Sequence, residues 1–254
     1  MKAWLRFFRV VNLPTVPGDV LVGAAAVCAS LTSGKDSASP LVAVCVASVF
    51  LYMFGLADND IVGAKTDEGR PIPDGRISMR AARIARGFCL FGALIVGAAV
   101  NLPPGWWIAA FVLAVTVVIY NRTKWCLLMG LCRGLNVVCG GFSVCAPRIA
   151  PASQLASLGG YSLTSGKDSA SPLLWMSVCA VVWTLYIAVV TKYSEGEEMD
   201  AAKKRRVGFF IGAIVYLQLI ALIAFPVKPF LIAGAVLLIA LRLMKRFLPG
   251  VSAS

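Results

Sequence analysis

The sequence contains no histidine, and charged residues make up only 14% of its 254 positions. Soluble domains carry about 25% charged residues, so this composition argues against a soluble protein. The absence of histidine removes the most frequent metal ligand and the most frequent general base. Any metal site must therefore use other ligands, and any base must be a carboxylate, a tyrosine or part of a substrate.

The eight cysteines form no Cys-x-x-Cys pair, and nearly all of them fall within apolar runs. Cysteine in such runs behaves as a small apolar residue. This distribution argues against a zinc framework and against a disulfide scaffold.

Apolar residues are abundant instead, at 59% of the chain, and the mean hydropathy is +0.82. A helix needs roughly 20 apolar residues to cross the bilayer, where every backbone polar group must be paired within the protein. The alternating pattern of a membrane barrel is absent. We therefore predict an all-α, polytopic membrane helical bundle, forming one domain over residues 1–254. Eight spans are predicted, near residues 13–31, 40–57, 85–102, 106–120, 126–147, 173–191, 207–225 and 229–247.

Lysine and arginine are distributed unequally between the loops. With the N-terminus inside, 20 of the 24 cationic residues lie on the inner side, and only Lys35, Arg148, Lys167 and Lys228 lie outside. Cytoplasmic loops are enriched in such residues. The pattern predicts a cytoplasmic N-terminus, and it explains the net charge of +12 by topology and anionic lipid, with no nucleic-acid partner.

The segment SLTSGKDSASPL occurs twice, at residues 30–41 and 162–173. We interpret it as a recent local copy, because an ancient duplication would not keep a loop identical while its flanks diverged. Weaker echoes favour an older duplication: RVVN at 9–12 resembles RGLN at 133–136, and an acidic loop follows both the second and the sixth span. They predict two pseudo-repeated halves of four helices, with both acidic loops on one inner face.

Nine of the 12 acidic residues lie in these two loops, within residues 58–74 and 195–200. Asp60 and Asp67 are two helical turns apart on one face, with the Asn59 carbonyl beside them. A ligand set of oxygen atoms alone suits Mg²⁺, which binds one or two carboxylates together with substrate phosphates. The predicted metal ligands are Asn59, Asp60, Asp67, Glu195 and Glu198, and the predicted cofactor is Mg²⁺.

Cationic residues flank these acids: Lys65, Arg70, Arg76, Arg80, Arg83, Arg122, Lys124, Lys203 and Lys204. Mg²⁺ together with lysine and arginine can bind a diphosphate and stabilise its departure. The alternative is a solvated loop with arginines at lipid headgroups, which we favour for Arg80, Arg83 and Arg86.

Four further polar residues lie at or inside spans: Asn12, Asp19, Arg133 and Asn136. Such residues are costly in lipid unless they face a cavity or a partner. Arg9 and Asn12, like Arg133 and Asn136, are three positions apart and would each form a paired polar spot. We hypothesise that these residues line the headgroup end of a substrate cavity; the alternative is hydrogen bonding between helices.

The runs NDIVGAKTD at 59–67 and RPIPDGRIS at 70–78 resemble the first aspartate motif of the UbiA superfamily of intramembrane prenyltransferases, NDxxDxxxD followed by RPIPSGxIS. Residues 12–19 and 130–136 are also similar to pieces seen in some members. The resemblance covers roughly residues 5–225. It implies a helical bundle around a cavity open to lipid, Mg²⁺ held by two acidic loops, and transfer of a polyprenyl group from an allylic diphosphate to a small, perhaps aromatic, acceptor.

Within this resemblance, the catalytic residues are Asp60, Asp67 and Lys124. The substrate-binding residues are Asn12, Asp19, Arg70, Arg76, Arg133, Asn136 and Tyr193. Tyr52, Phe54, Tyr120 and Tyr186 are candidates to face the allylic carbocation, with ordinary packing as the alternative.

The sequence departs from the family pattern in three places. Gly63 stands where the middle aspartate of the motif falls, the second acidic motif is only YSEGEEMD at 193–200, and eight spans are counted where the family usually has nine. A catalytically impaired member is therefore one alternative.

Two other classes of membrane protein agree less well with the sequence. A cation-coupled transporter would place acids at mid-membrane, and here only Asp19 does so. The motif of CDP-alcohol phosphotransferases, DxxDGxxAR with GxxxDxxxD, is absent from the sequence.

Overall fold

The structure, a computed structural model, describes residues 2–28, 38–67, 69–145, 172–194, 201–225 and 228–247. These residues form helices and turns, with no strand among them. The helices, with 3₁₀ turns labelled η, are α1 (Lys2–Phe7), η1 (Val10–Asn12), α2 (Thr15–Cys28), α3 (Ala38–Val62), η2 (Gly63–Lys65), α4 (Met79–Ala99), α5 (Pro104–Thr123), α6 (Cys126–Cys145), α8 (Pro172–Ser194), α9 (Ala201–Ala224) and α10 (Lys228–Phe247).

The predicted all-helical membrane bundle is confirmed. Within the described ranges, seven helical segments are long and apolar enough to cross a membrane, and they lie in α2–α6, α8 and α9. Helix α10 contains a shorter apolar stretch, Phe230–Met244. Each of the eight predicted runs coincides with one helix, although the last has less apolar length than the others.

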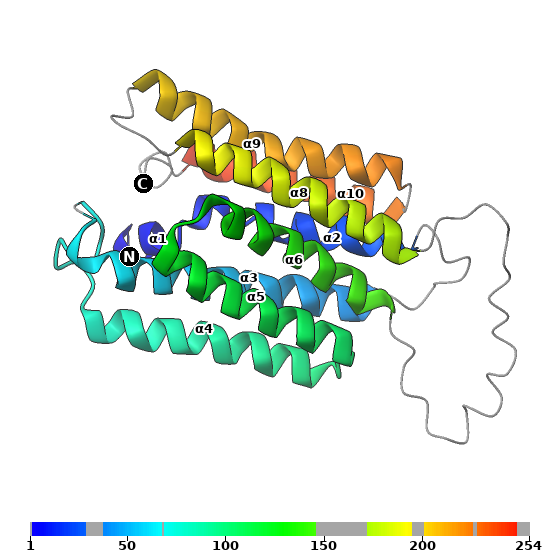
Figure 1. Ribbon diagram of the computed structural model, residues 1–254, viewed down its shortest axis with the longest axis horizontal. Helices are drawn as coiled ribbons and strands as arrows, with labels where there is room; N and C mark the ends of the chain where they lie inside the picture. Colours follow the sequence, from blue (N-terminus) through cyan, green and yellow to red (C-terminus); the bar gives the residue numbers. More distant parts are fainter. Residues whose placement is uncertain are drawn as a thin grey trace, which may run out of the picture.

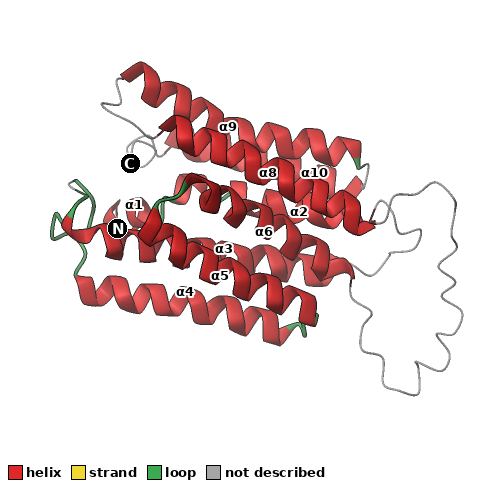
Figure 2. Cartoon of the chain, viewed as in Figure 1, coloured by secondary structure: helices red, strands yellow, loops and turns green. Residues whose placement is uncertain are grey.

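Successive long helices run antiparallel, so that the chain turns at the two ends of the bundle (Figures 1 and 2). One end carries α1, residues 63–67 and 69–78, the turn between α5 and α6, the end of α8 and the start of α9 (Figure 1). We call it the acidic end.

Helix α3 is longer than predicted at the acidic end. It continues to Val62, so Asp58, Asn59 and Asp60 lie on its last turns rather than in a loop. The side chains there are paired with cations from other segments, which allows a polar sequence to remain helical beyond the apolar run. The first part of the aspartate motif is therefore held on a rigid element.

Residues 69–78 form a folded segment that closes back on this helix end. Gly69 and Gly75 adopt positive φ values of 77° and 70°, a conformation that glycine reaches without steric cost. Ile72 and Ile77 are buried against Phe7 and its neighbours. Ser78 then caps α4 by accepting a hydrogen bond from the Ala81 amide at 3.2 Å.

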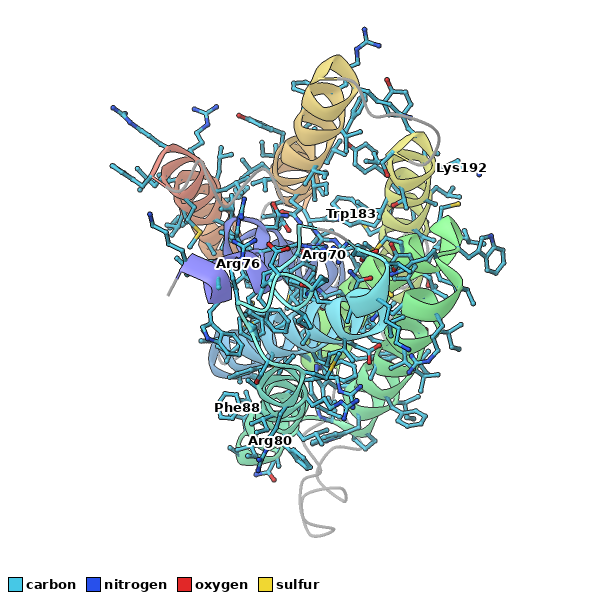
Figure 3. All side chains as sticks on the ribbon, turned by 90° about the vertical axis from the view of Figure 1, so that its left-hand side faces the viewer. Arg70, Arg76, Arg80, Phe88, Trp183 and Lys192 are labelled. Carbon is cyan, nitrogen blue, oxygen red and sulfur yellow. The ribbon has the colours of Figure 1, made fainter. Side chains whose placement is uncertain are left out.

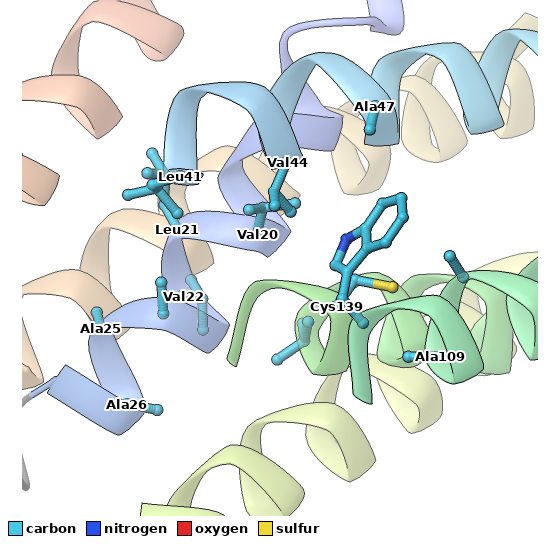
Figure 4. Packing of buried hydrophobic residues seen from close by; sticks show 14 of the residues in the cluster. Val20, Leu21, Val22, Ala25, Ala26, Leu41, Val44, Ala47, Ala109 and Cys139 are labelled. Atoms are coloured by element: carbon cyan, nitrogen blue, oxygen red, sulfur yellow. The ribbon is translucent and has the colours of Figure 1, made fainter. Parts of the chain in front are cut away.

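Helix α2 lies in the middle of the bundle and packs against α3, α6, α8, α9 and α10. Its residues Val20, Val22 and Ala25 are completely buried, and Figure 4 shows Val20 next to Val44 of α3. On the outside, large apolar side chains such as Phe91, Ile108 and Phe209 are exposed, as expected of surfaces that face lipid.

Helix α6 approaches α8 closely through two glycines. A β-carbon on Gly130 would clash with the Thr184 carbonyl, and one on Gly134 would clash with the Thr184 side chain. Membrane helices commonly use small residues in this way, since lipid supplies little hydrophobic drive for their association. Arg133 and Asn136 are therefore placed by one of the tightest contacts of the fold.

Candidate functional site

Asp60 and Asp67 converge on one guanidinium group at the acidic end. Arg70 Nη1 donates to Asp60 Oδ1 at 2.6 Å, and Arg70 Nη2 lies 3.1 Å from Asp67 Oδ2. Asp60 is almost completely buried, whereas Asp67 is partly exposed. Seen from this end, Arg70 lies near the middle of the bundle (Figure 3). The two predicted catalytic carboxylates therefore face a common point that accommodates positive charge.

Gly63 makes this arrangement possible. A β-carbon at position 63 would clash with the Asp67 carboxylate, with Asp67 Cγ only 2.7 Å away. The Asp67 amide donates to the Gly63 carbonyl at 2.9 Å, which folds the chain back onto the end of α3. Gly63 stands where the family motif has its middle aspartate, and the Asp67 carboxylate thus occupies the space beside it.

Two further cations lie beside these acids. Arg9 Nη2 is 3.6 Å from Asp60 Oδ1, and Lys124 Nζ donates to Asn59 Oδ1. Both cationic residues have left-handed backbones, with φ of 42° at Arg9 and 55° at Lys124. This conformation costs a non-glycine residue about 1–3 kcal/mol, and such residues cluster at functional sites. Arg9 was predicted to line the headgroup end of the cavity together with Asn12, and it is among the lining residues.

Lys124 is exposed as a whole residue, but its ammonium is partly screened from solvent where it meets Asn59. This desolvation lowers the pKa of Lys124 below its ordinary value. Arg70 and Arg9 act in the same direction, whereas Asp67 and Asp60 oppose the shift. An anion arriving beside Lys124 would therefore meet a cation that is poorly compensated by its surroundings.

Asp58 faces the other side of α3 and belongs to a separate cluster. Its carboxylate pairs with Arg86 at 2.9 Å and Arg122 at 3.5 Å, and it accepts a hydrogen bond from Asn121 at 3.0 Å. Because Asp58 is 1% exposed, these contacts join α3, α4 and α5 inside the protein. Arg86, interpreted from the sequence as a lipid-headgroup arginine, is a structural ion-pair partner.

A cavity opens next to the acids and runs between α2, α3, α5 and α6. Its polar lining includes Arg9, Asn59, Arg133 and Asn136. The rest is mainly apolar and aromatic, and includes Leu51, Leu113, Val117, Met129, Tyr52 and Tyr120. Such a cavity suits a ligand with a charged end and a hydrocarbon body.

The polar residues inside the spans form a buried network around Asp19, which is 0% exposed. Arg133 Nε lies 2.9 Å from Asp19 Oδ2, Trp183 Nε1 donates to Oδ1 at 2.9 Å and Gln218 Nε2 donates to Oδ1 at 2.6 Å. Asn136 also donates to Oδ2, at 3.4 Å. The network links α2, α6, α8 and α9, and Trp183 lies centrally in Figure 3.

Two of the four polar residues predicted at or inside spans line the cavity, and three of them take part in hydrogen bonds between helices. Arg133 and Asn136 line the cavity and also hydrogen bond to α2, whereas Asp19 takes part only in the contacts between helices. Asn12, at the end of η1, is not among the residues that line the cavity, and its backbone carbonyl accepts a hydrogen bond from Thr15 Oγ1 at 2.8 Å. Gln218 and Trp183 escaped the sequence analysis, although a glutamine inside an apolar span is itself a signal of a buried polar contact.

The remaining predicted residues lie apart from this cluster. Arg76 pairs with Asp74 on the exposed side of the loop. Tyr193, at the end of α8, is 39% exposed and contacts the Phe210 ring. Glu195 and Glu198 lie outside the described residues, and within the described part no group of three acids or cysteines gathers as a metal site. Arg80, on α4, lies at the edge of the bundle (Figure 3), as expected of a headgroup arginine.

The fold and the site together define a multi-pass integral membrane protein with an acidic and cationic mouth on a largely apolar cavity. The chain belongs to the UbiA prenyltransferase family, whose pattern it matches over residues 20–249. The resemblance drawn from the aspartate motif is thereby confirmed. No curated protein sequence matches the chain.

Solved structures with the same fold include a digeranylgeranylglyceryl phosphate synthase, with 16% identity, a TM-score of 0.55 and coverage of 99% of this chain and 91% of the other. A UbiA homologue from Archaeoglobus fulgidus gives 15% identity, a TM-score of 0.55 and coverage of 100% and 90%. The structure of an Archaeoglobus fulgidus UbiA homologue bound to GPP and Mg²⁺ gives 13% identity, a TM-score of 0.51 and coverage of 98% of this chain and 88% of the other. At these identities the likeness concerns the fold.

Proposed function

We propose that the protein transfers a polyprenyl group from an allylic diphosphate to a small acceptor in a Mg²⁺-dependent reaction. The observation that carries this proposal is the convergence of Asp60 and Asp67 with Arg70, Arg9 and Lys124 at the mouth of an apolar cavity. A diphosphate at the mouth and a hydrocarbon chain in the cavity would satisfy both environments. The relative that binds GPP and Mg²⁺ supports the same substrate class.

The residues at the mouth are chemically suited to Mg²⁺. Asp60 Oδ1 and Asp67 Oδ2 both lie within 3.1 Å of one guanidinium, so their oxygens already face a shared positive charge. Two carboxylates, completed by substrate phosphate and water, are a usual ligand set for this ion. Asn59, Glu195 and Glu198 complete the proposed ligands. When bound, Mg²⁺ would neutralise charge on the diphosphate.

The protein's own residues would bind and orient the substrates. Arg70 and Lys124 would hold the diphosphate, and the flanking Arg9 adds a third positive charge at the mouth. Arg76, which was also predicted to bind substrate, pairs with Asp74 on the exposed side of the loop and is not part of this set. Asn12, Arg133, Asn136 and Tyr193 are the proposed contacts of the substrates themselves. Asp19 would act indirectly, by positioning Arg133 and Asn136, because its carboxylate already accepts hydrogen bonds from both of them.

In the transfer, the allylic carbon–oxygen bond breaks and its electron pair leaves with the pyrophosphate oxygen. The cations at the mouth stabilise that charge, while Tyr52 and Tyr120, which line the cavity, can face the allylic carbocation. The acceptor's nucleophilic atom forms the new bond to this carbon. Its proton passes to a carboxylate, a tyrosine or the released pyrophosphate, since the chain contains no histidine.

The test measures pyrophosphate release by the purified protein with geranyl, farnesyl and geranylgeranyl diphosphate, with and without Mg²⁺. We expect release to require Mg²⁺, and Asp60→Asn to lower its rate about 100-fold or more, since a group that stabilises developing charge is worth that much. Asp74→Asn is the matched control, because Asp74 pairs only with exposed Arg76 among the described contacts.

Two outcomes of this test are informative. Release that persists without Mg²⁺ and survives Asp60→Asn would overturn the proposal. Folded protein that binds diphosphate without releasing pyrophosphate would identify an impaired family member.

A cation-coupled transporter has little support, because the one mid-membrane acid, Asp19, is ion-paired with Arg133 at 2.9 Å.

We also propose that the acidic end faces the cytoplasm. Membrane topology follows the excess of lysine and arginine, and 20 of the 24 are expected on this side. Cysteines introduced at Ser78 and at Asn101, at opposite ends of α4, test the orientation. With an impermeant maleimide added to intact cells, we expect labelling of Asn101→Cys alone; labelling of Ser78→Cys alone would reverse the topology.

A further inference from the structure

The cavity extends well beyond the charged mouth. Ser48 lies 12 residues before Asp60 on α3, and Asn136 lies ten residues after the first residue of α6, Cys126. At 1.5 Å per residue these positions are about 15–18 Å along the helices from the acidic end. Both residues line the cavity, and both are more than nine-tenths buried. The deep part of an otherwise apolar cavity therefore contains two polar side chains.

The amide group of Asn136 is fixed in one orientation. Its nitrogen donates to the Val16 carbonyl at 3.0 Å and to Asp19 Oδ2 at 3.4 Å, so both of its hydrogens are used on α2. The amide oxygen has no hydrogen-bond partner in the part of the chain described. An unpaired buried acceptor is costly, so a partner that donates a hydrogen bond from within the cavity is favoured.

The Ser48 hydroxyl also lacks a hydrogen-bond partner among the described residues. Other hydroxyls on buried helical faces donate to a carbonyl of their own helix, as Ser143 does to Gly140 at 2.7 Å and Thr116 to Val112 at 2.7 Å. The Ser48 hydroxyl makes no such bond with the described residues, although it is 2% exposed. It can both donate and accept, so it complements the acceptor-only oxygen of Asn136.

The charges nearby indicate that the ligand at this depth is neutral. Arg133, which also lines the cavity, is ion-paired with Asp19 at 2.9 Å. The nearest residues of the lining, such as Leu51 and Leu113, are apolar. Bringing an anion to this depth would leave it without a dedicated counter-ion, at a large desolvation cost.

We propose that Ser48 and Asn136 form a subsite that recognises the hydroxyl group of a neutral ligand. Asn136 Oδ1 accepts the hydrogen bond of the ligand hydroxyl, and Ser48 makes the second hydrogen bond to the same group. The subsite itself stands on the two unpaired buried atoms and on the cavity that they share.

The experiment compares two probes that differ at one group, 4-fluorophenol and 4-fluoroanisole, in which a methyl group replaces the hydroxyl hydrogen. Their binding to purified protein in detergent is titrated by fluorine NMR, without diphosphate or Mg²⁺. We expect the phenol to bind about 10-fold more tightly than the anisole, as expected for a buried acceptor that is satisfied by one ligand and not by the other.

Two variants separate the subsite from partition into detergent. Ser48→Ala should reduce the preference for the phenol at least threefold, with an unchanged thermal unfolding profile. Ser143→Ala is the matched control: it removes an equally buried serine hydroxyl that already has its carbonyl partner, and it should keep the full preference.

Equal binding of the two probes to the unaltered protein would overturn the proposal, as would an undiminished preference in Ser48→Ala. Because the titration contains no diphosphate, either result would leave the pyrophosphate-release test unaffected. Conversely, a preserved phenol preference without pyrophosphate release would retain the subsite and reject prenyl transfer.

Discussion

Gly63 illustrates how one residue changes meaning between the sequence and the structure. In the sequence it is the place where an acid of the family motif is missing. In the structure its lack of a side chain admits the Asp67 carboxylate, which then shares Arg70 with Asp60. The number of acids is reduced at this position, but the two that remain are brought together.

We therefore predict that restoring a side chain at position 63 weakens the site. Gly63→Ala and Gly63→Asp should each lower the affinity for divalent metal about 10-fold, a loss typical of displaced ligand-supporting groups. The measurement is Mn²⁺ binding by electron paramagnetic resonance in the presence of a non-hydrolysable diphosphate. Thermal stability should change little, because the displaced Asp67 side chain can move toward solvent.

Gly87→Ala provides the control for this prediction. Gly87 is also helical, and a β-carbon there would meet nothing within 4 Å. An increase in Mn²⁺ affinity in Gly63→Asp would show instead that the missing acid is a true loss, and that Asp67 does not replace it.

At the scale of a single element, helix α6 packs between α2 and α8 and contributes two polar residues, Arg133 and Asn136, to the cavity lining. The sequence motif GLCRGLN at 130–136 combines small residues with the arginine and the asparagine. The glycines permit the approach to α8, and the polar residues then face α2 and the cavity. Packing and ligand contact are thus coupled along one helix.

Substitution of Gly130 should separate the two helices. Gly130→Ala would place a β-carbon against the Thr184 carbonyl, which cannot move without α8. We expect a loss of about 1–3 kcal/mol in unfolding free energy, the usual cost of overpacking, together with weaker binding of 4-fluorophenol. Reversible unfolding by SDS in mixed micelles measures the first, and the fluorine NMR titration measures the second.

Gly208→Ala serves as the comparison, because an added β-carbon there meets open space. If Gly130→Ala unfolds at the same SDS fraction as Gly208→Ala, the close approach of α6 to α8 is not required for stability.

At the scale of the whole molecule, the Asp19 network connects the early helix α2 to α6, α8 and α9. Its members come from distant parts of the chain, and Asp19 and Arg133 are 114 positions apart. Removal of one charge from a buried pair leaves the other uncompensated. Replacement of both by apolar residues is far less costly.

Accordingly, Asp19→Leu should destabilise the protein by about 3–5 kcal/mol, whereas the double variant Asp19→Leu/Arg133→Met should recover most of that loss. SDS unfolding of the single and double variants gives the coupling. A double variant as unstable as Asp19→Leu alone would show that Arg133 is not the main partner of Asp19 in the folded protein.

Several features of this molecule follow from local sequence. The eight apolar runs determine the helices, since lipid leaves the backbone no other way to pair its polar groups. The runs at 59–67 and 70–78 identified the acidic end and the family. Asn59, Asp60, Asp67, Arg70 and Lys124 were predicted from this local information, and the structure brings them to one mouth.

Contacts between helices could not be predicted from local sequence. The sequence contains Asp58 and Asp60 as similar acids, but helix rotation directs the first to Arg86 and Asn121 and the second to Arg70. Trp183, Gln218 and Ser48 carry no local motif. Their roles depend on which faces of distant helices meet, and therefore on packing that only the folded bundle defines.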